Sequence, residues 1–452
     1  MSGKGHIYKR CGCTVVENGT RKQLGKGCPQ LKRPDGAWNP RHGTWTFAIS
    51  VEGERGSRKQ IVRGGYDSQR EAQAAMDELK GKAARGIDVA SRLTVGQYLR
   101  EWIGSKKDIK RNTLRSYTGH IDRYWDPHLG HLRLADLRVQ HVATVFAAID
   151  SHNELCRRGK AIRPVGPASV QRIRATLRTA LSDALRQGLI TTNPAALVKL
   201  PSAKRPKGLV WTDDRVERWQ AEVDVLVAKG MRLKKARAAV STPSKVMVWR
   251  PDQLGTFLDS ASADPLYALW HLYAFRGLRR GEACGLEWPE VDLAGGTITI
   301  VRQRISIGGV VHEDTPKSDA GERTIALDAG TVMALKAHRK QQLADRLAAG
   351  GEWVESGKVF TTRDGRPLDP EHVTDRFYDL CVDAGVPPIR LHDLRHGAAS
   401  LMLAAGVSMK TVQETLGHSN IALTANTYTS VYPEVAQAAA EAAAALVPRA
   451  AR

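Results

Sequence analysis

The segment 391–432 constrains this chain more strongly than any other part, because it places several reactive side chains at fixed intervals along predicted helices. Its sequence is LHDLRHGAASLMLAAGVSMKTVQETLGHSNIALTANTYTSVY. A His-x-x-Arg pair opens an apolar run, a Leu-Gly-His triplet closes a helix, and a tyrosine follows inside Thr-Tyr-Thr. These side chains are His392, Arg395, His418 and Tyr428. Residues of these types hold phosphate groups and attack them, so the segment predicts chemistry on a phosphate.

Two further motifs lie upstream. The sequence GLRRGEACGL begins at Gly277, and TPKSDAGERTIAL places a lysine just before a predicted turn between two strands. Together with segment 391–432, these motifs resemble the tyrosine recombinase (phage integrase) family, whose members cut DNA with a tyrosine and rejoin it to a new partner. The resemblance is most specific from Val246 to Tyr432.

The resemblance assigns phosphate binding to two arginines. The family pattern Gly-Leu-Arg-x-x-Glu places the first at Arg279, and not at its neighbours Arg276 and Arg280. The second is Arg395. Arginine suits this task because its planar guanidinium holds a phosphate through two hydrogen bonds. Taken singly, each arginine has an ordinary alternative as a surface or ion-paired residue.

The same resemblance assigns three residues to proton transfer and hydrogen bonding. Lys317 matches the hairpin lysine that protonates the leaving 5′ oxygen, and His392 takes the position of proton transfer with the nucleophile. His418 matches a histidine that hydrogen-bonds the phosphate. Each has an ordinary alternative, as a solvated turn lysine or a helix-end histidine. The joint match of six residues in the family's order favours the catalytic interpretation.

The nucleophile that the resemblance implies is Tyr428. A free tyrosine has a pKa of about 10, so it needs help to lose its proton at neutral pH. Tyr432 lies close by but lacks the Thr-Tyr-Thr context, and a packing role is the ordinary alternative for either ring. The implied function is a site-specific DNA recombinase that integrates or excises a mobile element. Its 3′-phosphotyrosine intermediate would retain the bond energy needed for rejoining.

The charge distribution favours a nucleic-acid partner. The net charge is +21 and the pI is near 9.9. Residues 1–250 hold 48 Lys and Arg against 22 Asp and Glu, a net of +26, whereas residues 251–452 hold 20 against 25, a net of −5. We therefore expect most DNA-phosphate contacts in the first 250 residues, although the predicted chemistry lies beyond them.

Length and residue pattern predict a multidomain protein. We expect a small α+β N-terminal module, an all-α domain, and a mixed, mainly-α catalytic domain with a small antiparallel β-sheet. The resemblance implies that the first two are an arm-type DNA-binding domain and a core-binding domain. The predicted boundaries are 1–90 for the arm-type domain, 91–200 for the helical core-binding domain, 201–245 for a linker or insertion, and 246–452 for the catalytic domain with a C-terminal tail helix.

Four residues of the N-terminal module form a candidate zinc site: Cys11, Cys13, Cys28 and His42. Thiolate and imidazole groups are ligands that zinc selects. The spacing is loose, and Cys-x-Cys is less diagnostic than Cys-x-x-Cys, so small buried thiols beside a surface histidine are the alternative. The six cysteines of the chain show no paired framework, which favours reduced thiols in a cytosol.

No other cofactor is predicted. The chain has no Gly-x-x-x-x-Gly-Lys-Ser/Thr loop, which argues against ATP. It also has no paired carboxylates arranged to hold two magnesium ions, and the tyrosine mechanism needs none. No uninterrupted run of about 18 apolar residues and no secretory signal is present, so we expect a cytoplasmic protein without a membrane partner.

The resemblance implies double-stranded DNA at attachment sites as the main partner, and a homotetramer when two such sites are brought together. An excision factor and a host DNA-bending protein are further candidate partners. Two other functions compete. A type IB topoisomerase-like enzyme would not need a separate arm module, and a non-enzymatic DNA-binding regulator would lack a catalytic residue, yet none of the six is missing.

Overall fold

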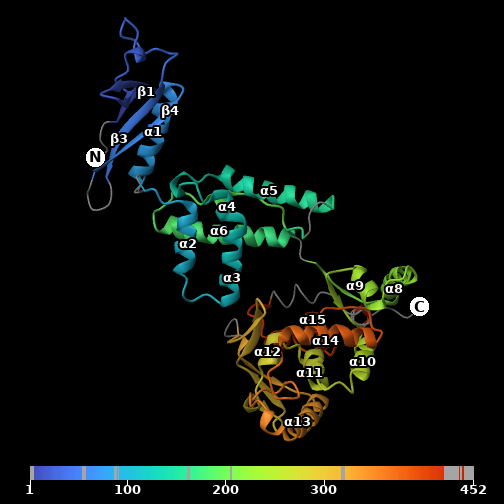
Figure 1. The fold of residues 1–452 in the computed structure, drawn as a ribbon. Coiled ribbons are helices and arrows are strands. Elements are labelled where there is room, and N and C mark those ends of the chain that lie inside the picture. Colours follow the sequence, from blue (N-terminus) through green and yellow to red (C-terminus); the bar gives the residue numbers. More distant parts are fainter. Residues whose placement is uncertain are drawn as a thin grey trace, which may run out of the picture. The chain divides into compact units, whose positions relative to one another are not determined.

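The computed structural model divides the chain into two compact units, Met1–Lys204 and Arg205–Arg452. The residues that it describes are 5–52, 58–85, 89, 91–159, 163–203, 206–316, 321–421, 437, 440 and 441. Figure 1 shows the elements of both units along the chain.

The N-terminal module of the first unit is an antiparallel sheet with one helix, α1, packed on it (Figure 1). Ser68 caps the helix, because its hydroxyl accepts a hydrogen bond from the Glu71 backbone N–H. The residue pattern predicts strands over 44–51 and 58–62. Both are present, together with two earlier strands that the pattern does not predict. The sheet order is β2-β1-β3-β4, formed by β1 (His6–Glu17), β2 (Thr20–Gly25), β3 (Thr44–Glu52) and β4 (Arg58–Tyr66), and α1 spans Gln69–Ala84.

The rest of the first unit is helical among its described residues. The spacing of Thr94 and Gln97 predicts a capping box, and the two residues form it at the start of α2. The sequence predicts a helix that starts near Thr113 and ends before Pro127. The chain instead continues through one π-helical turn, and Pro127 lies in the first turn of α4, where proline is tolerated. The helices are α2 (Val95–Gly104), α3 (Arg111–His120), the π turn (Ile121–Trp125), α4 (Asp126–Leu129), α5 (Val139–Arg157), α6 (Pro167–Arg186) and α7 (Pro194–Leu197).

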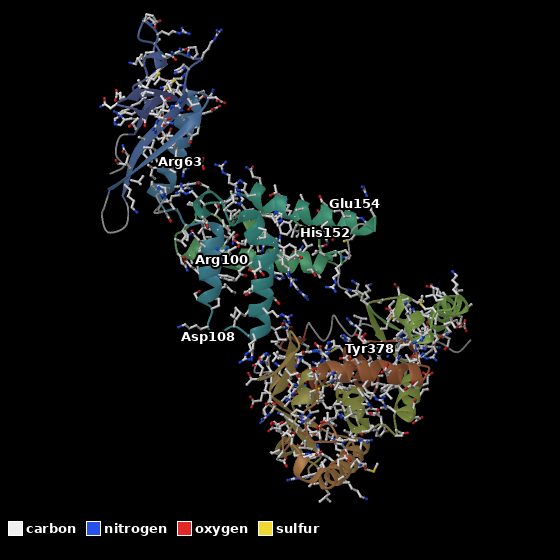
Figure 2. The ribbon with its side chains drawn as sticks, in the orientation of Figure 1. Arg63, Arg100, Asp108, His152, Glu154 and Tyr378 are labelled. Atoms are coloured by element: carbon white, nitrogen blue, oxygen red, sulfur yellow. The ribbon has the colours of Figure 1, made fainter. Side chains whose placement is uncertain are left out.

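The helical region has its own hydrophobic core. Ile173, Leu177 and Leu181 of α6 are buried in it, as the residue spacing predicts. The same spacing predicts that Leu185 continues this apolar face. Leu185 is 41% exposed, so the buried face of α6 ends one turn earlier. At the solvent-facing end of α5, Glu154 forms ion pairs with Arg157 and Arg158 (Figure 2).

The segment predicted as a linker or insertion is folded into the second unit. Its helix α8 (Asp213–Ala228) buries Trp219 and Val223 in the same hydrophobic cluster as Phe257 and Phe377. The indole of Trp211 donates a hydrogen bond to the carbonyl of Pro388, 3.1 Å away. The second unit therefore begins near residue 206 and includes most of the stretch 201–245. Its other elements here are β5 (Gly208–Val210), α9 (Leu233–Ala239) and β6 (Val246–Val248), with β5 and β6 pairing in parallel.

The remainder of the second unit is mainly helical, with two small antiparallel sheets, β11-β8-β7 and β10-β9. The residue pattern predicts one strand over 297–305, but this stretch forms two strands. The strands are β7 (Val291–Asp292), β8 (Thr297–Ile300), β9 (Gln303–Ile307), β10 (Val310–Asp314) and β11 (Arg323–Ala326). The helices are α10 (Pro251–Ser260), α11 (Tyr267–His271), a π turn (Leu272–Arg276), α12 (Arg280–Gly285), α13 (Ala329–Ala349), α14 (Pro370–Asp383), α15 (Leu391–Ala404) and α16 (Met409–Leu416).

In the part of the chain that the structure describes, no helix combines the length and apolar character that a membrane crossing needs. Of the predicted tail helix over 433–445, residues Gln437, Ala440 and Glu441 are helical. The rest of that prediction lies outside the described residues.

Candidate active site

The C-terminal end of α16 is bound by three arginines from separate elements. The carbonyl oxygens of three consecutive residues each accept a hydrogen bond: Thr415 from Arg323 Nε (2.7 Å), Leu416 from Arg395 Nη2, and Gly417 from Arg279 Nη2 (2.8 Å). The last carbonyls of a helix have no partner inside the helix and carry its negative pole, so they attract cations. The end of α16 therefore gathers three guanidinium groups.

Arg395 ties this helix end to the π turn after α11. It lies on α15, is only 2% exposed, and donates from Nη1 to the carbonyl of Gly277, 2.7 Å away. Gly277 adopts a left-handed backbone with φ 61°. A Cβ there would lie 2.7 Å from Leu416 Cδ2 and 3.2 Å from Ala398 Cβ. Only glycine therefore permits α15, α16 and the turn to approach so closely.

Glu282 balances two of the arginines. Its side chain is 1% exposed, and its carboxylate pairs with Arg279 Nη1 at 2.5 Å and Arg323 Nη2 at 2.9 Å. Burial alone would raise the pKa of Glu282, but hydrogen bonds and charge from Arg323, with the charge of Arg279, hold it below its ordinary value. The carboxylate is therefore ionised and fixes both guanidinium groups, while about a third of the Arg279 side chain stays exposed.

The two predicted histidines differ in their surroundings. His418 follows Gly417 and is 7% exposed, and burial together with the charges of Arg395 and Arg279 lowers its pKa to about 3. His392 lies on the first turn of α15, with its ring 5.4 Å from the ring of His396. Desolvation by packed neighbours, with the charges of His396 and Arg395, lowers the pKa of His392 below its ordinary value. Both rings are neutral at pH 7.

The structure thus brings Arg279, Arg395 and His418 together, with His392 three residues before Arg395 on the same helix. Lys317 and Tyr428 lie outside the described residues, as does Tyr432. Lys317 belongs to the connection between β10 and β11.

The two arginines that the resemblance set aside point elsewhere. Arg276 pairs with Asp328, with 2.6 Å between Nη2 and Oδ2, and Arg280 donates from Nη1 to the hydroxyl of Thr374 at 2.7 Å. Sequence reasoning missed Arg323, and it gave Glu282 no role. The available signal was position: Arg323 opens a strand-like run over 323–327, six residues after Lys317.

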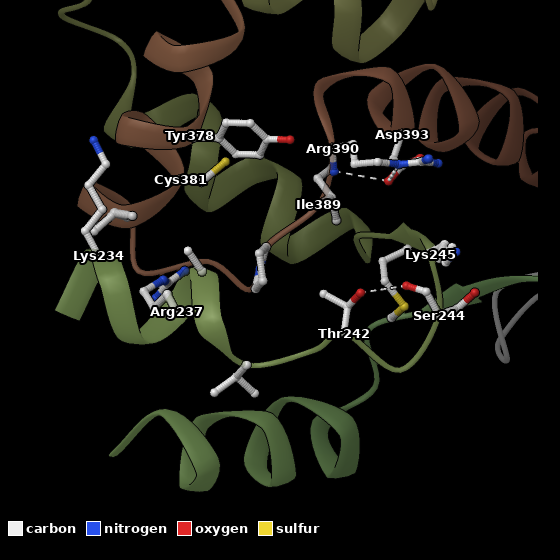
Figure 3. Close-up of a pocket in the computed structure, with 15 residues that line it drawn as sticks. Lys234, Arg237, Thr242, Ser244, Lys245, Tyr378, Cys381, Ile389, Arg390 and Asp393 are labelled. Carbon is white, nitrogen blue, oxygen red and sulfur yellow. Dashed lines mark hydrogen bonds and ion pairs between the residues drawn. The ribbon is translucent and has the colours of Figure 1, made fainter. Parts of the chain in front are cut away.

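A pocket of about 480 Å³ lies next to the start of α15. It is formed by α9, the strand that follows it, α14 and the residues before α15 (Figure 3). Arg390 precedes α15, and its guanidinium pairs with the buried carboxylate of Asp393, 2.6 Å away. Asp393 also accepts the Arg390 backbone N–H and so caps the helix that carries His392 and Arg395. Residues of the segment 201–245 thus form one wall of the pocket beside the start of α15.

The N-terminal module brings all four residues of the candidate metal site together. One ligand atom from each of Cys11, Cys13, Cys28 and His42 lies within 4.8 Å of the others. This cluster is far from α16 in sequence and belongs to the first unit.

Comparison with known proteins gives matches along most of the chain. The phage integrase family matches residues 249–434, an arm DNA-binding domain matches 39–83, and the N-terminal SAM-like domain of phage integrases matches 94–146.

The alignments with individual relatives extend over most of this chain and nearly all of each relative. The tyrosine recombinase XerC-like protein of Caldanaerobacter subterraneus subsp. tengcongensis is 25% identical, covering 87% of this chain and 94% of the relative. The integrase of Saccharopolyspora erythraea is 26% identical, covering 86% and 90%. Among solved structures, the Tn1549 transposon integrase in complex with a circular intermediate DNA aligns with a TM-score of 0.54 at 18% identity, covering 78% of this chain and 99% of that one, so the two share a fold.

Proposed function

The chain belongs to the phage integrase family of tyrosine recombinases, and from this premise we propose that the end of α16 is where it cleaves and rejoins DNA. It is a site-specific DNA recombinase that works through a covalent 3′-phosphotyrosine. The observation that carries the proposed site is the convergence of Arg279, Arg395 and His418 on the end of one helix. A phosphodiester carries a negative charge, and this end of the fold concentrates positive charge.

Arg279 and Arg395 hold the two non-bridging oxygens of the scissile phosphate. Each guanidinium has five N–H donors in a planar fork, so contacts with backbone carbonyls and with phosphate are compatible. Because Glu282 and the α16 carbonyls fix the guanidinium groups beforehand, little reorganisation is needed as charge develops on the phosphate. These contacts support a preorganised oxyanion site.

The neutral histidines suit the remaining proton chemistry. His392 has a lowered pKa and accepts the proton of Tyr428 as the tyrosine attacks the phosphorus. His418 donates a ring N–H to a phosphate oxygen. The negative phosphate favours the imidazolium form, so DNA binding raises both pKa values toward neutrality. Lys317 protonates the departing 5′ oxygen, and the reverse sequence rejoins the strand.

The partners follow from the charge distribution and the relatives. The Tn1549 transposon integrase was solved with a circular intermediate DNA. We assign duplex attachment-site DNA to this chain, with residues 1–90 on arm sequences, 91–200 on the core sequence, and a homotetramer joining two sites. An excision factor and a host DNA-bending protein complete the proposed assembly. The net charge of +26 over residues 1–250 supports this division.

Covalent trapping on a library of candidate attachment sequences tests the function. Tyr428→Phe keeps the aromatic ring but removes the nucleophilic oxygen, so it should bind DNA normally and form no covalent adduct. Tyr432→Phe is the matched control and should form the adduct at a normal rate. A covalent adduct with Tyr428→Phe, or its loss with Tyr432→Phe, would show that the nucleophile is assigned wrongly.

A further inference from the structure

The three cysteines and one histidine of the N-terminal module come from three separate segments. Cys11 and Cys13 lie on β1, beyond the part that pairs with β3, and Cys28 precedes a short 3-10 turn. His42 lies just before β3. The pairing of β1 with β2 is irregular between Cys11 and Thr14. Such a bulge re-aims side chains, and here four ligand atoms face a common centre.

The spacing of these atoms fits a metal ion. Sγ of Cys13 and Sγ of Cys28 each lie 3.5 Å from the same ring nitrogen, Nε2 of His42. A tetrahedral zinc ion with Zn–S distances of about 2.3 Å and a Zn–N distance of about 2.0 Å separates neighbouring donor atoms by about 3.5–3.8 Å. Both sulfur–nitrogen distances of 3.5 Å agree with sulfur–nitrogen edges of that tetrahedron.

Hydrogen bonding between thiols and imidazole explains this arrangement less well. Nε2 of His42 carries either one hydrogen or one lone pair, so it forms a good hydrogen bond with only one of the two thiols. A disulfide would join two of the three sulfur atoms and leave the third thiol and the imidazole without a purpose; all three cysteines are free. A metal ion at the centre uses all four groups at once.

The backbone around the cluster is already held in place. The ammonium group of Lys9, only 3% exposed, donates to the carbonyls of Asn39 and His42. Gly43 has φ 70°, and a Cβ there would lie 2.6 Å from Leu31 Cδ2 and 2.7 Å from the Arg10 carbonyl oxygen. Glycine thus allows the segment carrying His42 to approach β1. A preformed site of this kind lowers the ordering needed for metal binding.

This end of the module has little apolar packing of its own. Among the described residues between 10 and 43, the buried hydrophobic side chains are Cys28 and Leu31. The hydrophobic core of the module instead uses residues of β3, β4 and α1. Small folds with too small a core commonly depend on a metal ion or on disulfides. The β1–β2 hairpin and the 26–43 loop therefore need a cross-link.

We propose that Cys11, Cys13, Cys28 and His42 bind one structural Zn²⁺ ion. Three thiolates and one imidazole form a closed tetrahedral set, which leaves no position for a reacting water, so the ion has no part in the strand-exchange chemistry. It joins the β1–β2 hairpin to the loop before β3. Because binding of the ion favours the folded form in which the four ligands lie together, the ion adds to the stability of residues 11–43.

Metal content of the full-length protein, purified without a polyhistidine tag, tests this proposal. The wild type should hold about one zinc ion per chain, since one such set binds one ion. Cys28→Ser and His42→Ala should lose it, whereas His42→Cys should keep it, because four cysteines also form a zinc site. Cys156→Ser is the matched control and should retain the ion. Sγ of Cys156 lies 3.5 Å from Nε2 of His152, and among the described residues this pair belongs to no cluster of three or more metal-ligating side chains.

Two results would overturn the proposal. One is less than half an ion per wild-type chain, with the half-buried Cys11 and Cys13 reacting at once with a thiol reagent under native conditions while the buried Cys284 and Cys381 do not. The other is equal zinc content in Cys28→Ser and the wild type. If the variants are insoluble, cobalt substitution of the wild type still decides. A closed thiolate set gives intense tetrahedral d–d bands and sulfur-to-cobalt charge transfer, and their absence contradicts the site.

Discussion

Replacing Glu282 by glutamine tests how far the candidate active site depends on one buried carboxylate. Glu282 is 1% exposed and pairs with Arg279 and with Arg323, itself only 7% exposed. The amide of Glu282→Gln has the same shape but turns an N–H donor toward a guanidinium and leaves the Arg323 charge uncompensated. Breaking a buried pair in this way costs about 3–5 kcal/mol. We therefore expect the free energy of unfolding of the second unit to fall by that amount.

The control is Glu414→Gln. Glu414 pairs with Lys410 at the surface, with both side chains more than 60% exposed, so its loss should cost less than about 1 kcal/mol. Urea unfolding followed by tryptophan fluorescence measures both variants, since Trp249 and Trp270 report on the core of the second unit. The two transitions of a two-unit chain are fitted separately. A Glu282→Gln cost below 1 kcal/mol would refute the view that this carboxylate holds the arginines in place.

Three further predictions concern individual side chains. Arg279→Ala should slow covalent cleavage by about 10²–10³-fold, as for loss of one preorganised oxyanion donor. The guanidinium of Arg280 contacts Thr374 instead, so Arg280→Ala should cleave DNA nearly normally. Equal effects of the two substitutions would show that Arg279 does not contact the phosphate. Lys317→Ala should be rescued by a substrate with sulfur in place of the bridging 5′ oxygen, because that leaving group needs no proton, and an equal defect on both substrates counts against Lys317 as the acid. The ring of His418 takes up a proton near pH 6.5 in the unfolded chain but stays neutral until about pH 3 in the folded protein. His418 should therefore lower the free energy of unfolding as the pH falls between these values, with a limiting slope of about 1.4 kcal/mol per pH unit. His418→Asn should reduce this slope, and an unchanged slope would contradict the lowered pKa.

The motifs that could be found from sequence are those in which identity and spacing coincide. Arg395 is three residues after His392, and a glycine precedes His418, so these motifs can be recognised without any knowledge of the fold. The partnership of Glu282 with Arg323 could not be found this way. The two residues are 41 positions apart, and their pairing depends on how β11 lies beside α12 and α16.

The segment 201–245 illustrates a second limit. Its proline and lysine content is typical of a linker. Within it, the apolar spacing of Val216, Trp219 and Val223 fits the helix predicted over 213–229, but the sequence does not show what that helix packs against. That spacing marks a buried helix face, and the structure packs it into the core of the second unit. Strand β1 was also not predicted from the sequence. Half of it pairs only with β2, so its residues alternate weakly between exposed and half-buried.

The arginines at the end of α16 are positioned by backbone carbonyls and not by the side chains of residues 415–417. A peptide carbonyl is the same in every amino acid. The positions of these arginines therefore depend on the path of the main chain, and substitution of the half-exposed Thr415 should leave the arginines in place. That path requires a left-handed backbone at residues 277 and 417, a conformation that glycine adopts without strain. A saturation mutagenesis map of the region should show tolerance at 415 beside intolerance at 277 and 417, a contrast that side-chain chemistry alone does not account for.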